Sequence, residues 1–395
     1  MAPSLASVVD QLVAGFSRAL ELCDAQTVST QVSLAQIPAP TAHEQRRAQW
    51  MIQAFAHMGL RARRDEVGNV VANAALDGDA PPVVVCAHLD TVFSHEISHH
   101  VHERLGHYVG PGIGDNARGL SGMLTIARVL HDHGVRTRHP IVYAATVGEE
   151  GEGDLRGARH LFAHDGAAAC AAFALDGAGD ERIVTHAVGT RRFRVTIIGP
   201  GGHSWASSDA PNPLHAAADL TAHLARLPLR STGRTTLAVT RIQGGDAVNA
   251  IPSSAALDVE IRSPQASLLD AGEHELRRLL SVAIDRENAR TTSSRGHLSA
   301  LTAITSNRPA GEAPQDSAPV RAAVAATQAI DRVPEFAIAS TDANIPLSLG
   351  IPAIALGAGG AGGDTHTTSE WFENRSGALG LARALAAIVA TAELA

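Results

Sequence analysis

The stretch VVVCAHLDTV, residues 83–92, begins as a buried strand and ends in two polar side chains. Its first four residues, Val83 to Cys86, form an uninterrupted apolar run, which is typical of a strand covered on both faces. His88 and Asp90 follow where the strand should end, and residues two apart in a strand project from the same face. Taken alone, such a pair is more often a polar strand end than a functional site, so its meaning depends on the rest of the chain.

The composition is that of an ordinary globular protein long enough for two domains. The 395 residues are 45% hydrophobic and only 3% aromatic, and they carry a formal charge of −8, with every positive side chain an arginine. No basic patch interleaved with aromatics and no run of about 18 apolar residues occurs, which argues against a nucleic-acid partner and a membrane span. The N-terminus lacks the features of a signal peptide. Three scattered cysteines (Cys23, Cys86 and Cys170) argue against a disulfide framework and favour the cytoplasm.

Helix and strand patterns alternate from residue 27 to about 186. This alternation predicts an α/β fold with a mostly parallel sheet and helices on both faces. The expected strands are 65–74, which would be exposed, and 83–90, 141–147 and 170–176, and the expected helices are 43–59, 120–134 and 157–164.

Near residue 188 the pattern changes to the order β-α-β-β-α-β, which is typical of a ferredoxin-like split unit. The α/β pattern returns with a helix at 318–331, a buried strand at 351–359 and a helix from about 376. We therefore expect a catalytic metal-binding domain made of 1–187 and 306–395. Residues 188–305 would form an inserted lid and dimerisation domain.

Five clusters of acids or histidines fall at strand ends or just beyond them, all in the α/β portion. In open α/β sheets the binding crevice lies outside the carboxyl ends of the strands, so the clusters should converge. They are His88 with Asp90, Asp115 in GPGIGDN, Glu149 with Glu150 after IVYAAT, Asp176 in ALDG, and His366 in a glycine-rich loop.

Each cluster also has a simpler explanation. Asp115 could be a helix N-cap, the Glu149–Glu150 pair a solvated turn, and Asp176 part of ordinary turn chemistry. Together, however, two histidines and several carboxylates suit Zn²⁺, Mn²⁺ or Co²⁺. The clusters contain one carboxylate more than a single ion would bind. This suggests two ions, about 3.5–4 Å apart, that share an aspartate. Thr367 and Glu370 can form a capping box for the segment that comes after them.

The ordered motifs H-L-D, G-P-G-I-G-D-N, G-E-E-G-x-G-D-L, L-D-G and D-T-H-T-T resemble those of the M20-type co-catalytic metallopeptidases. These include peptidase T-like aminopeptidases, carnosinase-like dipeptidases, a glutamate carboxypeptidase, aminoacylases and desuccinylases. The resemblance runs from about residue 28 to the end of the chain, including the insertion. It implies two divalent ions per subunit, zinc first and manganese or cobalt as alternatives.

The resemblance also implies a role for each matching residue. Asp115 would bridge the two ions, and the peptide from Asp115 to Asn116 would be cis. Asp90 would orient a histidine ligand, and Glu149 would act as the general base that moves a proton from water to the leaving nitrogen. The implied metal ligands are His88, Asp115, Glu150, Asp176 and His366.

Three residues of the insertion match substrate contacts of the family. His203 in GGHSW would reach a neighbouring active site and stabilise an oxyanion; in many relatives this is the site of the other subunit, which implies a homodimer. Asn249 would contact substrate or oxyanion, although before Ile-Pro it could also be turn chemistry. Arg262 would bind a substrate carboxylate, or could be a surface charge on a strand.

Residue 176 tends to be Asp in the aminopeptidase and dipeptidase branch and Glu in the carboxypeptidase and deacylase branch. Together with the peptidase T-like segment 339–359, Asp176 favours a di- or tripeptidase. The alternative is an aminoacylase or amidohydrolase that acts on N-acyl amino acids. A catalytically silent binding protein is a remote alternative, because Glu149 and Asp90 are both present. The histidine-rich segment 94–107 is expected to be an exposed hairpin without a metal.

Overall fold

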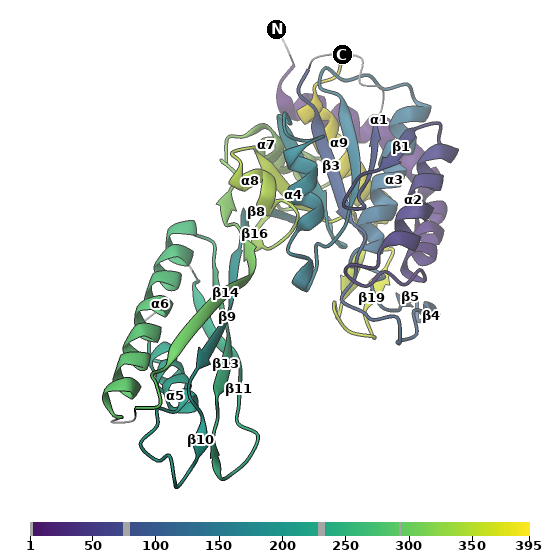
Figure 1. Ribbon diagram of the computed structural model, residues 1–395. Helices are drawn as coiled ribbons and strands as arrows, with labels where there is room; N and C mark the ends of the chain where they lie inside the picture. The colour runs from purple at the N-terminus through teal and green to yellow at the C-terminus, as the bar shows by residue number, and fades with distance from the viewer. Residues whose placement is uncertain (1–2, 74–79, 228–233, 292–293) are drawn as a thin grey trace. The chain divides into compact units, whose positions relative to one another are not determined.

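The computed structural model describes residues 3–73, 80–227, 234–291 and 294–395 (Figure 1). The chain forms two compact units. The larger comprises residues 1–187 and 312–395, and the smaller, the inserted unit, comprises 188–311. The larger unit is therefore built from two chain segments on either side of one insertion.

The larger unit is organised around a nine-stranded, mostly parallel sheet. Its four central strands are parallel to one another and completely buried, as their apolar sequences require. In spatial order these are β6 (Ile141–Thr146), β3 (Val83–His88), β7 (Ala171–Leu175) and β17 (Ala353–Leu356). The flanking strands β2 (Val70–Asn73) and β8 (Arg182–Ala187) are antiparallel to β6 and β17. The outer strands are β1 (Arg61–Arg64), β15 (Gly311–Glu312) and β16 (Glu335–Ala339).

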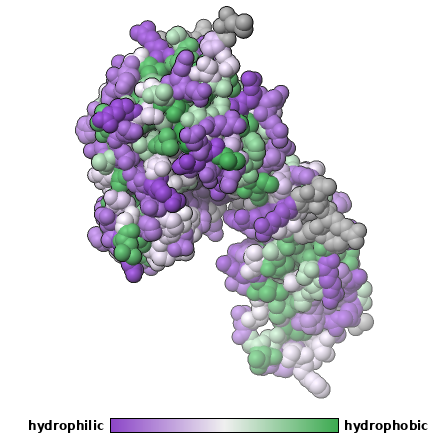
Figure 2. Space-filling view, turned by 180° about the vertical axis from the view of Figure 1, so that it is seen from behind, coloured by the Kyte–Doolittle hydropathy of each residue, from purple (hydrophilic) through white to green (hydrophobic). Residues whose placement is uncertain are grey.

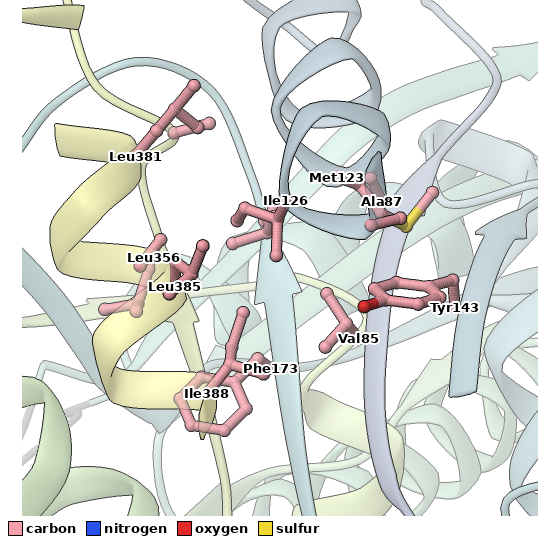
Figure 3. Close-up of a cluster of buried hydrophobic side chains, with 14 of the residues drawn as sticks. Val85, Ala87, Met123, Ile126, Tyr143, Phe173, Leu356, Leu381, Leu385 and Ile388 are labelled. Carbon is pink, nitrogen blue, oxygen red and sulfur yellow. The ribbon is translucent and has the colours of Figure 1, made fainter. Parts of the chain in front are cut away.

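Helices cover both faces of this sheet, and alternate residues of the strands belong to two separate cores. Val83 and Val85 pack into the core on one face, and Val84 and Cys86 pack into the core on the other. Figure 3 shows side chains of α3 and α9 meeting those of the central strands in the first core. That core includes α1 (Leu5–Ala35), α2 (Gln45–His57), α3 (Ala117–Asp132), α7 (Ala318–Ala329) and α9 (Gly377–Ala392). The second includes α4 (Arg156–Ala163) and α8 (Asn344–Ser348).

A small antiparallel sheet carries two loops that matter for the site. Its order is β18 (Ala361–Gly363), β19 (Trp371–Glu373), β5 (His107–Val109) and β4 (His102–Arg104). The loop after β5 leads to Asp115, and the loop between β18 and β19 contains His366. Because β19 pairs with β5, the two loops start from neighbouring strands (Figure 1).

The inserted unit is a four-stranded antiparallel sheet with two helices on one face. Its strands, in spatial order, are β11 (Thr236–Gly244), β13 (Ser254–Ser263), β9 (Gly189–Ile198) and β14 (Ser299–Arg308). Helices α5 (Pro213–Leu224) and α6 (Ala266–Ala289) share its apolar core. A short hairpin, β10 (Gly202–His203) with β12 (Ala250–Ile251), completes the unit. The unit extends to residue 311 rather than 305, because β14 runs three residues beyond the expected strand end.

In the view of Figure 2, hydrophobic residues lie scattered among hydrophilic ones over the surface of the larger unit. Scattered apolar side chains are normal on a protein surface. In the part of the chain that the structure describes, no helix is long and apolar enough to span a membrane.

Candidate metal centre

Three neighbouring parallel strands end at one edge of the central sheet, and expected site residues come after each of them. β6, β3 and β7 are adjacent and parallel, so their carboxyl ends lie side by side. His88 closes β3, Glu149 and Glu150 come after β6, and Asp176 comes directly after β7. This edge is where the crevice of an open α/β sheet lies.

Asp115 reaches the same edge from the loop before α3. The Asp115–Asn116 peptide bond is cis, as the resemblance implies. Asn116 caps α3, because its side-chain oxygen accepts the N–H of Gly119 at 3.0 Å. Its side-chain nitrogen donates to the carbonyl of Leu175, at the end of β7, at 2.9 Å. The N-cap explanation for Asp115 is therefore wrong, and its carboxylate is free to serve the site.

A first cluster contains His88, Asp115 and Asp176, each with one ligand atom within 4.8 Å of the others. His88 Nε2 lies 2.9 Å from Asp115 Oδ1 and 3.9 Å from Asp176 Oδ1. One nitrogen and two carboxylate oxygens at this spacing form a typical partial ligand set for zinc or manganese.

A second cluster contains Asp115, Glu150 and His366. His366 Nε2 lies 3.1 Å from Asp115 Oδ2 and 2.9 Å from Glu150 Oε1. Asp115 therefore belongs to both clusters and turns a different oxygen towards each. The five expected ligands come together in the structure as two three-residue groups that share this aspartate.

Glu149 lies beside these clusters and is nearly buried. It forms a third group with His88 and Glu150, again within 4.8 Å. Glu149 is 5% exposed and Glu150 is 7% exposed, so the solvated-turn explanation for this pair is wrong.

The protonation equilibria of the cluster reflect several acids close together in a buried site. Burial and the neighbouring Asp115 raise the pKa of Asp176 to about 7. Hydrogen bonds to Asp115 and Glu150 raise the pKa of His366 to about 10. Burial alone would lower the pKa of His88, but Asp115 and Asp90 hold it well above its usual value. These shifts favour proton uptake by the cluster when no metal is bound. Divalent cations could take the place of these protons, so the residues present fit a pair of metal ions.

Asp90 supports both the histidine and the glutamates. Its backbone carbonyl lies 3.0 Å from His88 Nδ1, and its carboxylate lies 3.7 Å from the same nitrogen. The carboxylate accepts the backbone N–H groups of Glu149 and Glu150 at 2.9 and 3.0 Å, and the hydroxyl of Thr41 at 2.9 Å. The backbone carbonyl of Asp90 therefore mainly orients His88. The carboxylate of Asp90 mainly fixes the turn that contains Glu149 and Glu150, which we call the glutamate turn.

The sequence profile of Peptidase family M20/M25/M40 matches residues 84–391, which include every expected ligand. The chain belongs to this family. It is a metallo-hydrolase that acts on C–N bonds of peptides or amides, and the resemblance stated from its motifs is confirmed.

Several solved structures share the fold of nearly the whole chain. Aminopeptidase PepT from Bacillus cereus is 22% identical, with 93% of this chain and 98% of that chain covered and a TM-score of 0.74. The YxeP protein of Bacillus subtilis, a dinuclear metal-binding peptidase, is 16% identical over 94% and 98%, with a TM-score of 0.68. An amidase of the hydantoinase/carbamoylase family from Burkholderia vietnamiensis is 18% identical over 95% and 97%, with a TM-score of 0.65. These similarities establish the fold, including the inserted lid domain, and leave the substrate open.

Two of the three expected lid residues of this M20 chain lie together. His203 pairs with Ala250 in the short hairpin, next to Asn249, whose carbonyl accepts the N–H of Ser204 at 2.9 Å. His203 and Asn249 are both exposed.

Arg262 lies at the other end of the lid sheet. It is opposite Thr190 near the start of β9, and eight residues along β13 from Ser254, which corresponds to about 26 Å. Its guanidinium binds Glu260 at 2.7 and 3.2 Å. The structure therefore does not bring Arg262 to His203 and Asn249 within one inserted unit.

The motifs of this M20 chain do not reveal the pair of Glu44, which is buried, and Arg156, which is partly buried, beside the glutamate turn. Glu44 accepts the N–H of Gly148 at 3.1 Å and binds Arg156 through both carboxylate oxygens at 2.8 and 2.9 Å. Gly148 has a φ of +63°, and a Cβ there would lie 2.0 Å from the Arg156 guanidinium, so only glycine fits. Glu44 directly precedes α2, but its side chain makes no capping bond to that helix.

The capping box expected at Thr367 and Glu370 is wrong. The next segment is strand β19, and the Glu370 side chain instead binds the loop that carries Asp115. In the histidine-rich segment 94–107, β4 and β5 form the expected hairpin. Among the described residues, no group of three possible ligands includes these histidines.

Proposed function

We propose that this chain is a di-metal aminopeptidase that cleaves di- or tripeptides with a free amino end. The observation that supports this most is the shared Asp115, whose two oxygens face two separate ligand groups. In the proposal one ion is held by His88, Asp115 and Asp176. The other is held by Asp115, Glu150 and His366.

Two divalent ions bound there would polarise the scissile carbonyl and lower the pKa of a water molecule between them. Zinc is the first candidate, with manganese or cobalt as alternatives, because all three accept these nitrogen and oxygen ligands. Three free cysteines in the described structure are consistent with a reducing compartment, and we place the enzyme in the cytoplasm.

Glu149 is the proposed general base. It takes a proton from the attacking water and delivers it to the leaving nitrogen, so one carboxylate serves both proton transfers. Its backbone is held by Asp90, and the preceding Gly148 is held by Glu44. These two anchors limit the movement of the base relative to the ligands, which supports efficient proton transfer.

His203 is the proposed oxyanion donor. Its Nδ1 accepts the backbone N–H groups of Trp205 and Ala206 at 3.1 and 3.4 Å. A neutral imidazole that accepts at Nδ1 carries its proton on Nε2. The exposed Nε2–H is therefore a hydrogen-bond donor, as an oxyanion requires.

The distribution of lid residues supports a homodimer. An extended di- or tripeptide spans about 7–11 Å, far less than the distance along β13 between Arg262 and the end near His203 and Asn249. If Arg262 binds the substrate carboxylate while His203 and Asn249 bind near the reacting carbonyl, these contacts must come from two different lids. We propose that each active site receives His203 and Asn249 from the partner subunit.

The substrate class is tested with metal-reconstituted enzyme and matched substrates: a dipeptide, a tripeptide and their N-acetylated forms. The proposal requires hydrolysis of the free-amine forms only. Asp176 and the shared fold of aminopeptidase PepT favour this outcome. Hydrolysis of the acetylated forms only would establish the alternative, an aminoacylase or amidohydrolase for N-acyl amino acids, to which the shared fold of the amidase lends support.

A further inference from the structure

Glu370 is a buried carboxylate that lies outside both ligand groups and binds three backbone N–H groups. It is 1% exposed and lies at the end of the β18–β19 loop, four residues after His366. Its Oε1 accepts the N–H groups of Gly114 and Asp115, both at 2.7 Å, and its Oε2 accepts that of Gly112 at 3.1 Å. Its backbone carbonyl accepts the N–H of Gly110 at 2.9 Å.

These bonds join the two loops that supply the second ligand group. The loop from Gly110 to Asp115 carries the shared aspartate, and the loop that ends at Glu370 carries His366. The first loop is shaped around the carboxylate, because a Cβ on Gly114 would lie 3.0 Å from Glu370 Oε1. Fixing the N–H of Asp115 limits where its Cα and hence its carboxylate can lie.

The Glu370 carboxyl group is buried and matches the backbone donors around it. Glu370 is buried close to Asp115, and two like charges in a buried site repel one another. Three backbone donors offset part of this repulsion, and each of those three amides has an acceptor. A neutral side chain would avoid the repulsion, but it would offer fewer acceptor positions to the loop.

We propose that Glu370 is a positioning residue that couples the Asp115 loop to the His366 loop, so that both present their donor atoms to the same ion. This inference rests on the proposed two-metal site. It concerns metal affinity first and catalysis only through the metal. Partners that orient metal ligands typically contribute a factor of about 10–100 in metal affinity.

The test is a titration of metal-free protein with Zn²⁺ by isothermal calorimetry, using Glu370→Gln and Glu370→Ala. Glutamine keeps one oxygen for Gly114 and Asp115 and turns its NH₂ group towards the N–H of Gly112, whereas alanine removes all three acceptors. We expect Zn²⁺ affinity at one of the two sites to fall about 10-fold in the first variant and about 100-fold in the second. Raising the Zn²⁺ concentration should then restore hydrolysis towards the wild-type kcat.

Glu373→Gln is the matched control, because Glu373 lies on the same hairpin and its side chain is 36% exposed. It should titrate like the wild type. Reduced thermal stability of the metal-free Glu370 variants with unchanged Zn²⁺ affinity and stoichiometry would overturn the inference and leave Glu370 a purely structural residue. If Glu370→Ala does not fold, Glu370→Gln decides between the same two outcomes.

The wild-type titration separates this inference from the proposed function. A wild type that binds two ions but hydrolyses none of the substrates refutes the proposed activity, while the Glu370 comparison still stands. A wild type that binds two ions, with Glu370 variants that match Glu373→Gln, refutes only the positioning role. Uptake of fewer than two ions refutes both.

Discussion

The roles proposed for the two adjacent glutamates follow from the groups that they join. Glu150 lies 2.9 Å from His366 Nε2, while Glu149 is grouped with His88 and Glu150. Glu149→Gln keeps the size of the side chain and one acceptor oxygen but cannot take up a proton as a base. We expect kcat to fall by about 10²–10⁴, with metal content unchanged by elemental analysis.

Glu152→Gln is the control for this substitution, because Glu152 is exposed in the same turn. It should leave kcat unchanged. Full activity of Glu149→Gln would show that another group moves the proton, whereas loss of metal would make Glu149 a ligand.

Asp176 should destabilise the metal-free protein at neutral pH. Its pKa is raised from an ordinary value near 4 to about 7 in the folded state. Between these values the folded protein holds a proton that the unfolded chain releases, so stability falls as pH rises towards about 7. The effect is absent near pH 4 and fully developed near pH 8.

Asp176→Asn removes this effect, and comparison with the wild type isolates it from the other titrating groups. In metal-free protein at pH 8 we expect the variant to have the higher free energy of unfolding, by roughly 1–3 kcal/mol, and near pH 4 we expect no difference. Urea unfolding at the two pH values measures both. An equal effect at pH 4 and pH 8 would mean that packing, rather than titration, causes the change.

At the scale of elements, the ends of the buried strands could be predicted from the sequence. The buried carboxylates that hold the loops of the site could not. The buried runs that end at His88, Thr146 and Leu175 are local signals, and parallel strands bring the residues just beyond their carboxyl ends to one edge of the sheet. Glu44 and Glu370 cannot be found in this way, because each binds backbone N–H groups of a distant loop, and Glu44 also binds the distant Arg156. Every residue except proline has a backbone N–H, so no sequence motif shows which of these groups binds a distant carboxylate.

The edge strands were missed for a related reason. β8 (RIVTHA) mixes buried apolar residues with polar ones, and the residues of β16 (EFAIA) are exposed or half-buried, so neither sequence shows the long apolar run of a central strand.

Helix α4 should contribute to activity through Arg156, which contacts no ligand directly. Arg156→Ala leaves the buried Glu44 carboxylate without its cation, although the N–H groups of Ala42 and Gly148 remain as partners. We expect a loss of about 1–3 kcal/mol in the free energy of unfolding and a decrease in kcat, because the turn before Glu149 loosens.

Arg159→Ala is the control for Arg156→Ala. It tests whether removal of another arginine from α4 lowers stability and kcat to the same extent. Arg159 is on the same helix, 40% exposed, and pairs with Asp154, so its removal should cost less than about 1 kcal/mol. Equal losses of stability and kcat in the two variants, by urea unfolding and steady-state assay, would argue against a special role of the Glu44–Arg156 pair.

At the scale of the whole molecule, the change of pattern near residue 188 predicts an insertion with the element order that the structure has. The motifs alone, however, do not indicate which of its residues can act together. Strand register decides this: β13 carries Arg262 opposite Thr190, while the hairpin pairs His203 with Ala250 beyond the other end of the sheet. The sequence therefore predicts the lid but not how its contacts are divided.

That division leads to a prediction about the assembly. If His203 serves the active site of the partner subunit, His203→Ala and Glu149→Gln damage different parts of a shared site. Each variant alone should be inactive as a homodimer. In a mixed dimer, one site receives both defects and the other receives neither. Random reassociation of equal amounts makes half of the dimers mixed, so activity should recover to about a quarter of the wild-type value.

The measurement is the hydrolysis rate after the two variants are unfolded together and refolded, with light scattering to establish the dimer. In the control, Glu149→Gln is refolded with Glu152→Gln instead of with His203→Ala. This mixture shows how much hydrolysis a partner with an intact active site contributes. Recovery to about a quarter requires that His203 crosses between subunits. A dimer without recovery would assign His203 to the site of its own chain, and Arg262 could then not bind the carboxylate of the same short substrate, because about 26 Å of β13 separates them. A monomer that is active would exclude any contribution from a partner, and the role of either His203 or Arg262 would have to be abandoned.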